Sequence, residues 1–511
     1  MILKLFSQRP DHPLADGKEL KRILGELLVD RPVTAVDEVT TWFESLKHAR
    51  NFRIDQLFDI LRQLDDAAQP HLRRLTRDYL QSQHLSAPEQ QRLWTKCHGY
   101  WRELAAIYSL CLERARLDPK SRGSELLKPA LPLVETRVQA ARRCRLKWLA
   151  YRYAPVEKDL WQCLGASYLA AEEAGLAQKP VQLYPAQKGL TSVAQQYLHA
   201  LIFDCSSMDQ LLPEQIEMAD RLIAQFLSGV VLSTSPRPDS VYWVEAASGV
   251  APARLVRRPA DACSSQRFFS PAPALAALTE LIHAVERGDV PRDLNLGAEY
   301  QPKALLPVLR HLCTYWALQP PRRTYQRHPV RTRMAVLDGF EHCFMVFAGA
   351  AEHLHGEAGC LQHWLVENVS LGGFRAIMDG AAANDRIKLG TLLCLQVEGG
   401  DNWLLGVVRR FGGLAGGKTG VGVQVLSRRA QSVELRPRRS GFAVAVAVPG
   451  ICLRDRGETG VLRMVLPLGG FRVRESLDLI LDGRPHVLTP MELEESGSDF
   501  EIARFREPAA G

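Results

Sequence analysis

The sequence predicts a multidomain α+β protein with an N-terminal all-α helical domain, an antiparallel β-barrel and a C-terminal β domain. Its 511 residues exceed what one hydrophobic core usually accommodates. Apolar residues recur at helical spacing up to about Trp316, whereas beyond Gln319 they come in short, β-branched runs separated by glycines. We therefore expect a helical domain over 1–318, a barrel over 319–430 and a β domain over 431–511, which can close as a second, degenerate barrel.

The helical domain is predicted from apolar residues that repeat every three or four positions. Ser86 and Glu89 have the spacing of a capping box, which predicts that a helix begins there. Two short runs around Gly249 indicate a hairpin insertion near 240–256. The predicted helices include one starting near Leu20, one starting at Ile54, the one after Ser86, and Leu133–Tyr151, Asp159–Ala174, Thr191–Phe203, Pro213–Leu227, Pro273–Arg287 and Lys303–Ala317.

One helical segment matches the first half of a tetratricopeptide repeat, through Trp161, Leu164, Gly165 and Tyr168. No second copy follows about 34 residues later, which is the period of that repeat. Gly175 would also interrupt the pattern. We therefore favour an ordinary packed helix and keep a repeat-like domain as the alternative.

The C-terminal part is predicted to contain antiparallel strands, because its apolar runs are short and bounded by turn residues. The basic stretch from Arg428 to Arg439 is expected to join the two β regions. The predicted strands are Cys343–Phe347, Leu392–Val397, Trp403–Val408 and Val421–Leu426, followed by Phe442–Val448, Val461–Leu466, Leu477–Leu481 and Phe500–Phe505.

The composition is that of a cytoplasmic protein. No apolar run approaches the roughly 20 residues that cross a bilayer, and the first residues lack the basic start and apolar core of a signal peptide. We expect no membrane insertion. The eleven cysteines contain no Cys-x-x-Cys, which favours reduced thiols. The formal charge of +7 suits an anionic ligand but is small for a dedicated DNA-binding protein.

Three arginines precede the first β run. Arg323 and Arg327 are four residues apart, and Arg322 stands beside the first of them. A guanidinium group makes paired hydrogen bonds to phosphate oxygens and to the O6/N7 edge of guanine, and it stacks on base planes. Several arginines on one arm can therefore hold both the phosphates and the bases of a guanine nucleotide.

A second motif lies at the end of a predicted strand, where Asn368, Ser370 and Gly373 form Asn-x-Ser-x-x-Gly. The two short polar side chains can add directional hydrogen bonds, and a glycine lets a ligand approach the backbone closely. Nothing nearby supplies a nucleophile together with a base. The constellation therefore predicts a binding protein without a cofactor, a metal or a catalytic residue.

The Arg-x-x-x-Arg segment, the Asn-x-Ser-x-x-Gly turn and the Gly-Val-Gly-Val strand near Val421 together resemble the PilZ domain family, over about residues 322–427. The resemblance implies a six-stranded barrel that binds cyclic di-GMP. The implied ligand-binding residues are Arg322, Arg323, Arg327, Asn368, Ser370 and Gly373. The gap between Arg327 and Asn368 is longer than is usual in that family, which suggests an inserted loop near residue 355 that could shade the site.

Two other motifs compete with this interpretation. Residues 412–419 match the phosphate-binding loop of nucleotide hydrolases, but that loop requires a helix after Lys418 and Thr419, whereas a strand pattern follows. We favour a hairpin loop and expect no enzyme. His353, His355, Cys360 and His363 could ligate zinc, but their spacing matches no standard site.

The helix that contains Arg142, Arg143, Arg145, Lys147 and Arg152 has a basic face, which we interpret as solvated. The sequence thus favours a bacterial cyclic di-GMP receptor that relays its signal to a protein partner through the helical domain. The alternatives are a constitutive scaffold with a structural barrel and a nucleic-acid-binding regulator that uses this basic face, although we expect no nucleic acid.

Overall fold

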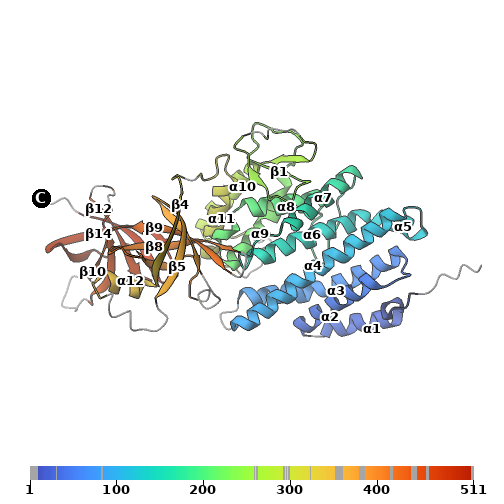
Figure 1. Cartoon of the computed structure of the whole chain (residues 1–511), viewed down its shortest axis with the longest axis horizontal. Coiled ribbons are helices and arrows are strands. Elements are labelled where there is room, and N and C mark those ends of the chain that lie inside the picture. The colour runs from blue at the N-terminus through green and yellow to red at the C-terminus, as the bar shows by residue number, and fades with distance from the viewer. Residues whose placement is uncertain are drawn as a thin grey trace, which may run out of the picture. The chain divides into compact units, whose positions relative to one another are not determined.

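The computed structural model describes residues 10–29, 31–81, 85–257, 259, 263–291, 294, 296, 300–322, 324–350, 361–378, 386–414, 418–438, 446–455, 458 and 460–507. The chain divides into two compact units, Met1–Pro321 and Arg322–Gly511. Figure 1 shows the first unit in blue to yellow and the second in orange to red. Each unit is described by itself below.

The first unit is mainly helical, as predicted, and the capping box at Ser86 is present, with Glu89 Oε2 accepting from the Ser86 amide at 2.9 Å. None of the described helices is long and apolar enough to span a membrane. The α-helices are α1 Gly17–Val29, α2 Pro32–His48, α3 Ile54–Leu80, α4 Ala87–Leu117, α5 Arg122–Leu127, α6 Leu131–Ala150, α7 Lys158–Glu173, α8 Val193–Cys205, α9 Pro213–Phe226, α10 Leu275–Glu286 and α11 Pro302–Trp316.

The helices of this unit share one continuous apolar core. Their buried residues fall at helical spacing because each helix turns one apolar face inward. A small antiparallel sheet packs on the helices, with strand order β2 (Ala253–Arg254), β1 (Tyr242–Glu245) and β3 (Gln266–Phe269). The motif that resembles a tetratricopeptide repeat lies on α7, where Gly165 meets the backbone of Ala246 just after β1. In this fold the motif therefore serves a helix-to-sheet contact.

The second unit contains two closed antiparallel barrels with the same order of strands. The predicted succession of a helical region, an antiparallel barrel and a C-terminal β domain is thus confirmed. The first barrel runs in the order β4 His328–Asp338, β5 Gln362–Ser370, β6 Gly373–Met378, β9 Thr419–Ser427, β8 Trp403–Gly413 and β7 Leu392–Val397. The second runs β10 Ala430–Pro437, β11 Val448–Leu453, β12 Val461–Pro467, β15 Phe500–Arg506, β14 Arg484–Ser496 and β13 Leu477–Leu481.

The predicted strand Cys343–Phe347 is wrong, because these residues belong to helix α12, Phe340–Phe347. A short apolar run does not distinguish a strand from a buried helix. The buried residues Phe340, Cys343 and Val346 are three apart, which is helical spacing. They pack into one core with residues of both barrels, and Asp499 of the second barrel accepts a hydrogen bond from the Phe340 amide at 2.6 Å. Helix α12 therefore joins the two barrels.

The expected basic linker between the β regions is also wrong. Only Arg428 and Arg429 separate β9 from β10, so most of the basic stretch is a strand of the second barrel. Its buried side chains, such as Val433 and Leu435, alternate with exposed charged ones, and the charges hid the strand pattern. The strand predicted at Phe442–Val448 begins instead at Val448, and residues 439–445 lie outside the described part.

Candidate ligand-binding site

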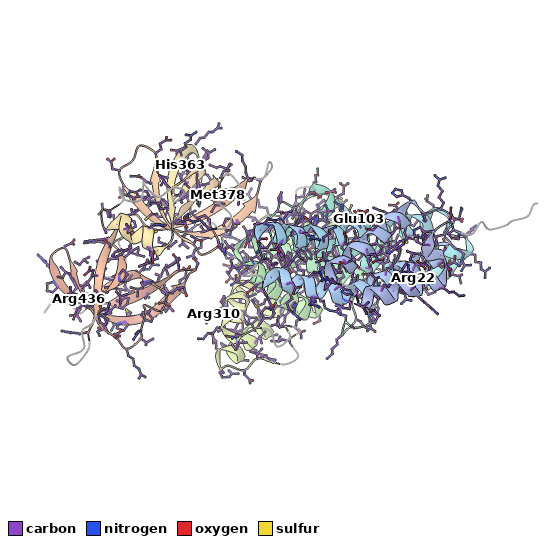
Figure 2. The ribbon with its side chains drawn as sticks, turned by 90° about the horizontal axis from the view of Figure 1, so that it is seen from below. Arg22, Glu103, Arg310, His363, Met378 and Arg436 are labelled. Carbon is purple, nitrogen blue, oxygen red and sulfur yellow. The ribbon has the colours of Figure 1, made fainter. Side chains whose placement is uncertain are left out.

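The sequence-predicted site residues lie on the arginine arm (residues 322–327) and on the hairpin formed by β5 and β6. Arg322 is exposed and Arg327 is partly buried, directly before β4, whereas Arg323 lies outside the described residues. Asn368 and Ser370 are at the end of β5, and Gly373 begins β6. Figure 2 shows the side chains of this barrel, with His363 of β5 and Met378 of β6 labelled.

The register of the strands brings the end of the arm to the hairpin. His328 of β4 pairs with Val369, and Pro329 pairs with Asn368. Arg327 directly precedes His328, which pairs with Val369, the middle residue of the Asn-x-Ser sequence. Asn368 and Ser370 are two apart on one strand, so both belong to the same face of the sheet.

The two-residue turn of the hairpin is held from three directions. Ser370 Oγ donates to the Gly373 carbonyl at 3.0 Å. A Cβ at Gly372 would come within 3.2 Å of the Tyr325 ring, so the arm packs directly on the turn. Arg428, which leads into the second barrel, donates from Nη2 to the Leu371 carbonyl at 3.2 Å. The turn is therefore fixed by the arm and by the start of the second barrel.

Asn368 carries a polar atom that the described fold does not satisfy. Its Oδ1 is buried and has no hydrogen-bond partner among the described residues. A buried acceptor without a donor costs about 1–3 kcal/mol, so such atoms often mark a place where another molecule binds. Asn368 lies opposite Pro329, which has no amide hydrogen to donate.

Gly373 has a structural requirement that is independent of any ligand. A Cβ at this position would overlap the carbonyl oxygen of Val423 on the neighbouring strand β9. The residue must therefore be glycine for the hairpin to pair with β9. A substitution of Gly373 would report on barrel packing, so it cannot test whether a ligand lies on this turn.

Sequence analysis missed a row of residues that crosses the outer face of the barrel beside the motif. Asn368 pairs with Arg375, Arg375 pairs with Gly422, and Gly422 pairs with Arg410. Arg375 Nε also contacts Glu367 Oε2 at 3.2 Å. The signal in the sequence is the alternation of β6, because Arg375 is two residues after Gly373 and its neighbours Phe374 and Ala376 are buried.

The two competing motifs are now located. Gly412 pairs with Gly420, and Thr419 begins β9, so residues 412–419 connect two antiparallel strands. A phosphate-binding loop would require a helix there. His353, His355 and Cys360 lie outside the described residues, and within the described part no group of three or more histidine, cysteine or acidic residues is arranged to hold a metal ion.

Part of the basic face of α6 is buried and paired, which corrects our interpretation of it as solvated, whereas Arg152, just beyond the helix, is exposed. Arg143 Nη1 contacts Asp220 Oδ1 at 2.5 Å, and Lys147 Nζ contacts Glu217 Oε2 at 2.7 Å. The two cationic side chains are only 13% and 12% exposed. Their partners come from α9, about 70 residues later, so the helix pattern alone could not indicate them. These cations are not available to nucleic acid.

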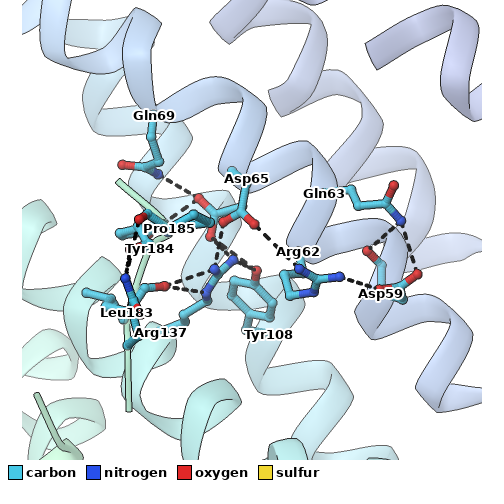
Figure 3. Close-up of polar contacts among 12 residues, drawn as sticks. Asp59, Arg62, Gln63, Asp65, Gln69, Tyr108, Arg137, Leu183, Tyr184 and Pro185 are labelled. Atoms are coloured by element: carbon cyan, nitrogen blue, oxygen red, sulfur yellow. Dashed lines mark hydrogen bonds and ion pairs between the residues drawn. The ribbon is translucent and has the colours of Figure 1, made fainter. Parts of the chain in front are cut away.

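A second buried polar network lies between α3, α4 and α6 and is drawn in Figure 3. Arg137 Nη1 contacts Asp65 Oδ2 at 2.9 Å and donates to Tyr108 Oη at 3.0 Å, and its Nη2 donates to the Leu183 carbonyl at 2.9 Å. Burial raises the pKa of Asp65, although the charge of Arg137 opposes that rise. Because the groups satisfy one another, this network fixes the loop near Leu183 and offers no ligand site.

The described fold is thus that of a multidomain α+β protein with a helical unit and two antiparallel barrels. Residues 18–238 match a family model described as the N-terminal domain of the cyclic-di-GMP receptor FimW. The match covers α1 to α9 and ends before β1. The match covers less than half of the chain and does not extend to the barrels, so the helical region is similar to the N-terminal domain of a cyclic di-GMP receptor. No curated protein matches the chain.

Proposed function

We propose that the chain is a cyclic di-GMP receptor of the PilZ type, whose first barrel binds the dinucleotide on its outer face. The ligand would lie against the β5–β6 hairpin, with Asn368 and Ser370 meeting a guanine. Arg322, Arg323 and Arg327 would hold the phosphates and the guanine edges. The chain would act in the cytoplasm and relay the signal to a protein partner through the helical unit.

The observation that carries this proposal is the junction of two motifs that are about 40 residues apart in the sequence. The pairing of Pro329 with Asn368 and the packing of Tyr325 over Gly372 join the arm to the hairpin. The buried, unsatisfied Oδ1 of Asn368 lies at that junction. An amide oxygen accepts well from the ring N–H and the amino group of guanine. The family match supports the same ligand independently.

We infer the relay of ligand binding to the helical unit from the order of the elements along the chain. The arm lies between α11 and β4 in the chain and leads directly into β4. A ligand that fixes the arm therefore restricts the connection between the two units. Capture of a partner with and without cyclic di-GMP tests this step, and equal capture in both conditions would favour the constitutive scaffold.

Binding itself is tested by calorimetry of the full chain with cyclic di-GMP. We expect Arg327→Ala and Asn368→Ala each to weaken binding by about 2 kcal/mol or more, roughly 30-fold, because each removes a contact in a desolvated site. Arg323→Ala should behave in the same way. The matched control is Arg436→Ala, an exposed arginine of the second barrel that is labelled in Figure 2. Variants of the arm and hairpin that bind like the parent would refute the site.

A further inference from the structure

We propose that the helical unit contains a second anion-binding site, which takes a phosphate-bearing small molecule of nucleotide size. The site is a cleft of about 600 Å³ between the C-terminal end of α3, helix α9 and the start of α11. Its volume lies within the range of small-molecule sites, about 300–1,000 Å³. The inference does not depend on the function proposed for the barrel.

The lining of the cleft is strongly cationic. Arg73 and Arg77 come from α3, Arg221 from α9 and Lys303 from α11, whereas Glu214 is the one carboxylate among the described lining residues. Although Arg221 is paired with Glu217 and Glu214 also lines the cleft, cations still outnumber carboxylates there, and a net positive concave surface attracts an anion. Arginine forks match phosphate oxygens in pairs, and a lysine ammonium adds a point charge.

The cations of the cleft differ in whether another side chain holds them in place. Arg73 and Lys303 are exposed and have no charged or hydrogen-bonding side-chain partner within the described residues. By contrast, Arg221 is held in place, since its Nε donates to Glu217 Oε1 at 2.7 Å and its Nη1 donates to the Leu296 carbonyl at 3.2 Å. The cleft therefore combines one fixed guanidinium with cations that can turn toward a ligand.

The remaining wall suits a phosphorylated compound with a ring. Tyr300 lines the cleft, and the Arg221 guanidinium lies 5.9 Å from the centre of its ring. Aromatic side chains are common stacking partners of bases. Gln301, Lys303 and Ala304 also belong to the N-terminal end of α11, whose first turn contains no acidic residue. The positive end of a helix adds to the attraction for phosphate.

The test uses the full chain with Arg327→Ala, so that the proposed barrel site contributes little. Inorganic pyrophosphate and cyclic di-GMP are titrated separately by calorimetry. We expect at least one of them to bind once per chain, and Arg73→Ala and Lys303→Ala each to weaken that binding about 10-fold, the scale of one lost charged contact. Binding of pyrophosphate but not of cyclic di-GMP would indicate that the cleft recognises simple phosphate groups. Binding of cyclic di-GMP would indicate that the cleft takes a second molecule of the dinucleotide.

The matched control is Arg74→Ala, an exposed arginine of α3 that does not line the cleft. Its binding should change less than twofold. The proposal is overturned if neither probe binds, or if Arg74→Ala weakens binding as much as Arg73→Ala does. The two proposed sites can be refuted separately. If Arg73→Ala abolishes the binding of cyclic di-GMP to the parent chain and Arg327→Ala does not, the barrel site alone is refuted.

Discussion

Asp204, in the last turn of α8, shows how the fold changes the chemistry of one residue. Burial, and to a smaller extent the charge of Asp209, raises the pKa of Asp204 to about 7, from a reference of 3.8. The folded chain therefore keeps the proton between these pH values, whereas the unfolded chain loses it. The folded state is penalised progressively as the pH rises from about 4 to about 7.

We expect Asp204→Asn to be more stable than the parent at pH 8 and to lose this advantage toward pH 4. The amide of asparagine cannot ionise, so the variant does not have the pH-dependent loss of stability that the carboxyl of Asp204 causes. Thermal melts of both proteins between pH 4 and 8 measure the difference. Asp239→Asn, at an exposed site, controls for the change in net charge. A constant difference in Tm across this range would contradict the assignment.

At the residue scale, local chemistry was predictable and distant partners were not. The alternation of a strand predicts that Asn368 and Ser370 share a face, and it needs only two residues of sequence. The role of Gly373 depends on Val423, about 50 residues later, so its packing requirement is visible only in the folded barrel. The ion pair between Arg143 and Asp220 was hidden for the same reason.

At the scale of elements, the contact of α7 with β1 depends on one glycine. We expect Gly165→Ala to destabilise the helical unit by about 1–3 kcal/mol, the usual cost of overpacking, because its Cβ would overlap the Ala246 carbonyl oxygen. Gly99→Ala is the matched control, since Gly99 also lies within a helix and a Cβ there meets nothing within 4 Å. It should stabilise by about 0.5–1 kcal/mol. Chemical denaturation measures both, and equal effects would contradict the packing argument.

Elements with a clear period were predictable from the sequence, and elements fixed by tertiary packing were not. The strands Leu392–Val397 and Leu477–Leu481 agree with the prediction at both ends. Helix α12 was mistaken for a strand because eight residues carry only two helical turns of pattern. Its conformation is decided by the space between two barrels, which no window of sequence describes.

At the scale of the whole molecule, the two barrels repeat one topology and differ in charge. The hairpin β11–β12 of the second barrel corresponds in strand order to β5–β6 of the first. Near that hairpin, one depression is lined by more carboxylates than arginines, namely Asp455, Glu458, Asp482 and Glu507 against Arg454 and Arg484, with His486 beside them. Carboxylates repel phosphate, and Asp455 also accepts the Arg428 amide at 3.1 Å. We therefore expect cyclic di-GMP to choose the first barrel, while the second braces its hairpin through Arg428.

The two units have separate cores, since the apolar cluster of the helical unit contains residues from Leu14 to Trp316 and the clusters of the barrels begin at Leu337. We therefore expect two calorimetric transitions. Cyclic di-GMP at about 100 times its Kd should stabilise the barrel transition by about 2.7 kcal/mol, because the proposed site exists only in the folded barrel. The experiment uses the chain with Arg73→Ala, in which the response of the cleft in the helical unit should be reduced.

Gly165→Ala assigns the transitions, because it should lower only that of the helical unit. Adding Arg327→Ala should then abolish most of the shift that cyclic di-GMP produces in the other transition. A ligand shift confined to the transition that Gly165→Ala lowers would place binding in the helical unit and contradict the barrel site. A single transition that moves as a whole would instead show that the two units unfold together, so that the chain is one cooperative structure despite its separate cores.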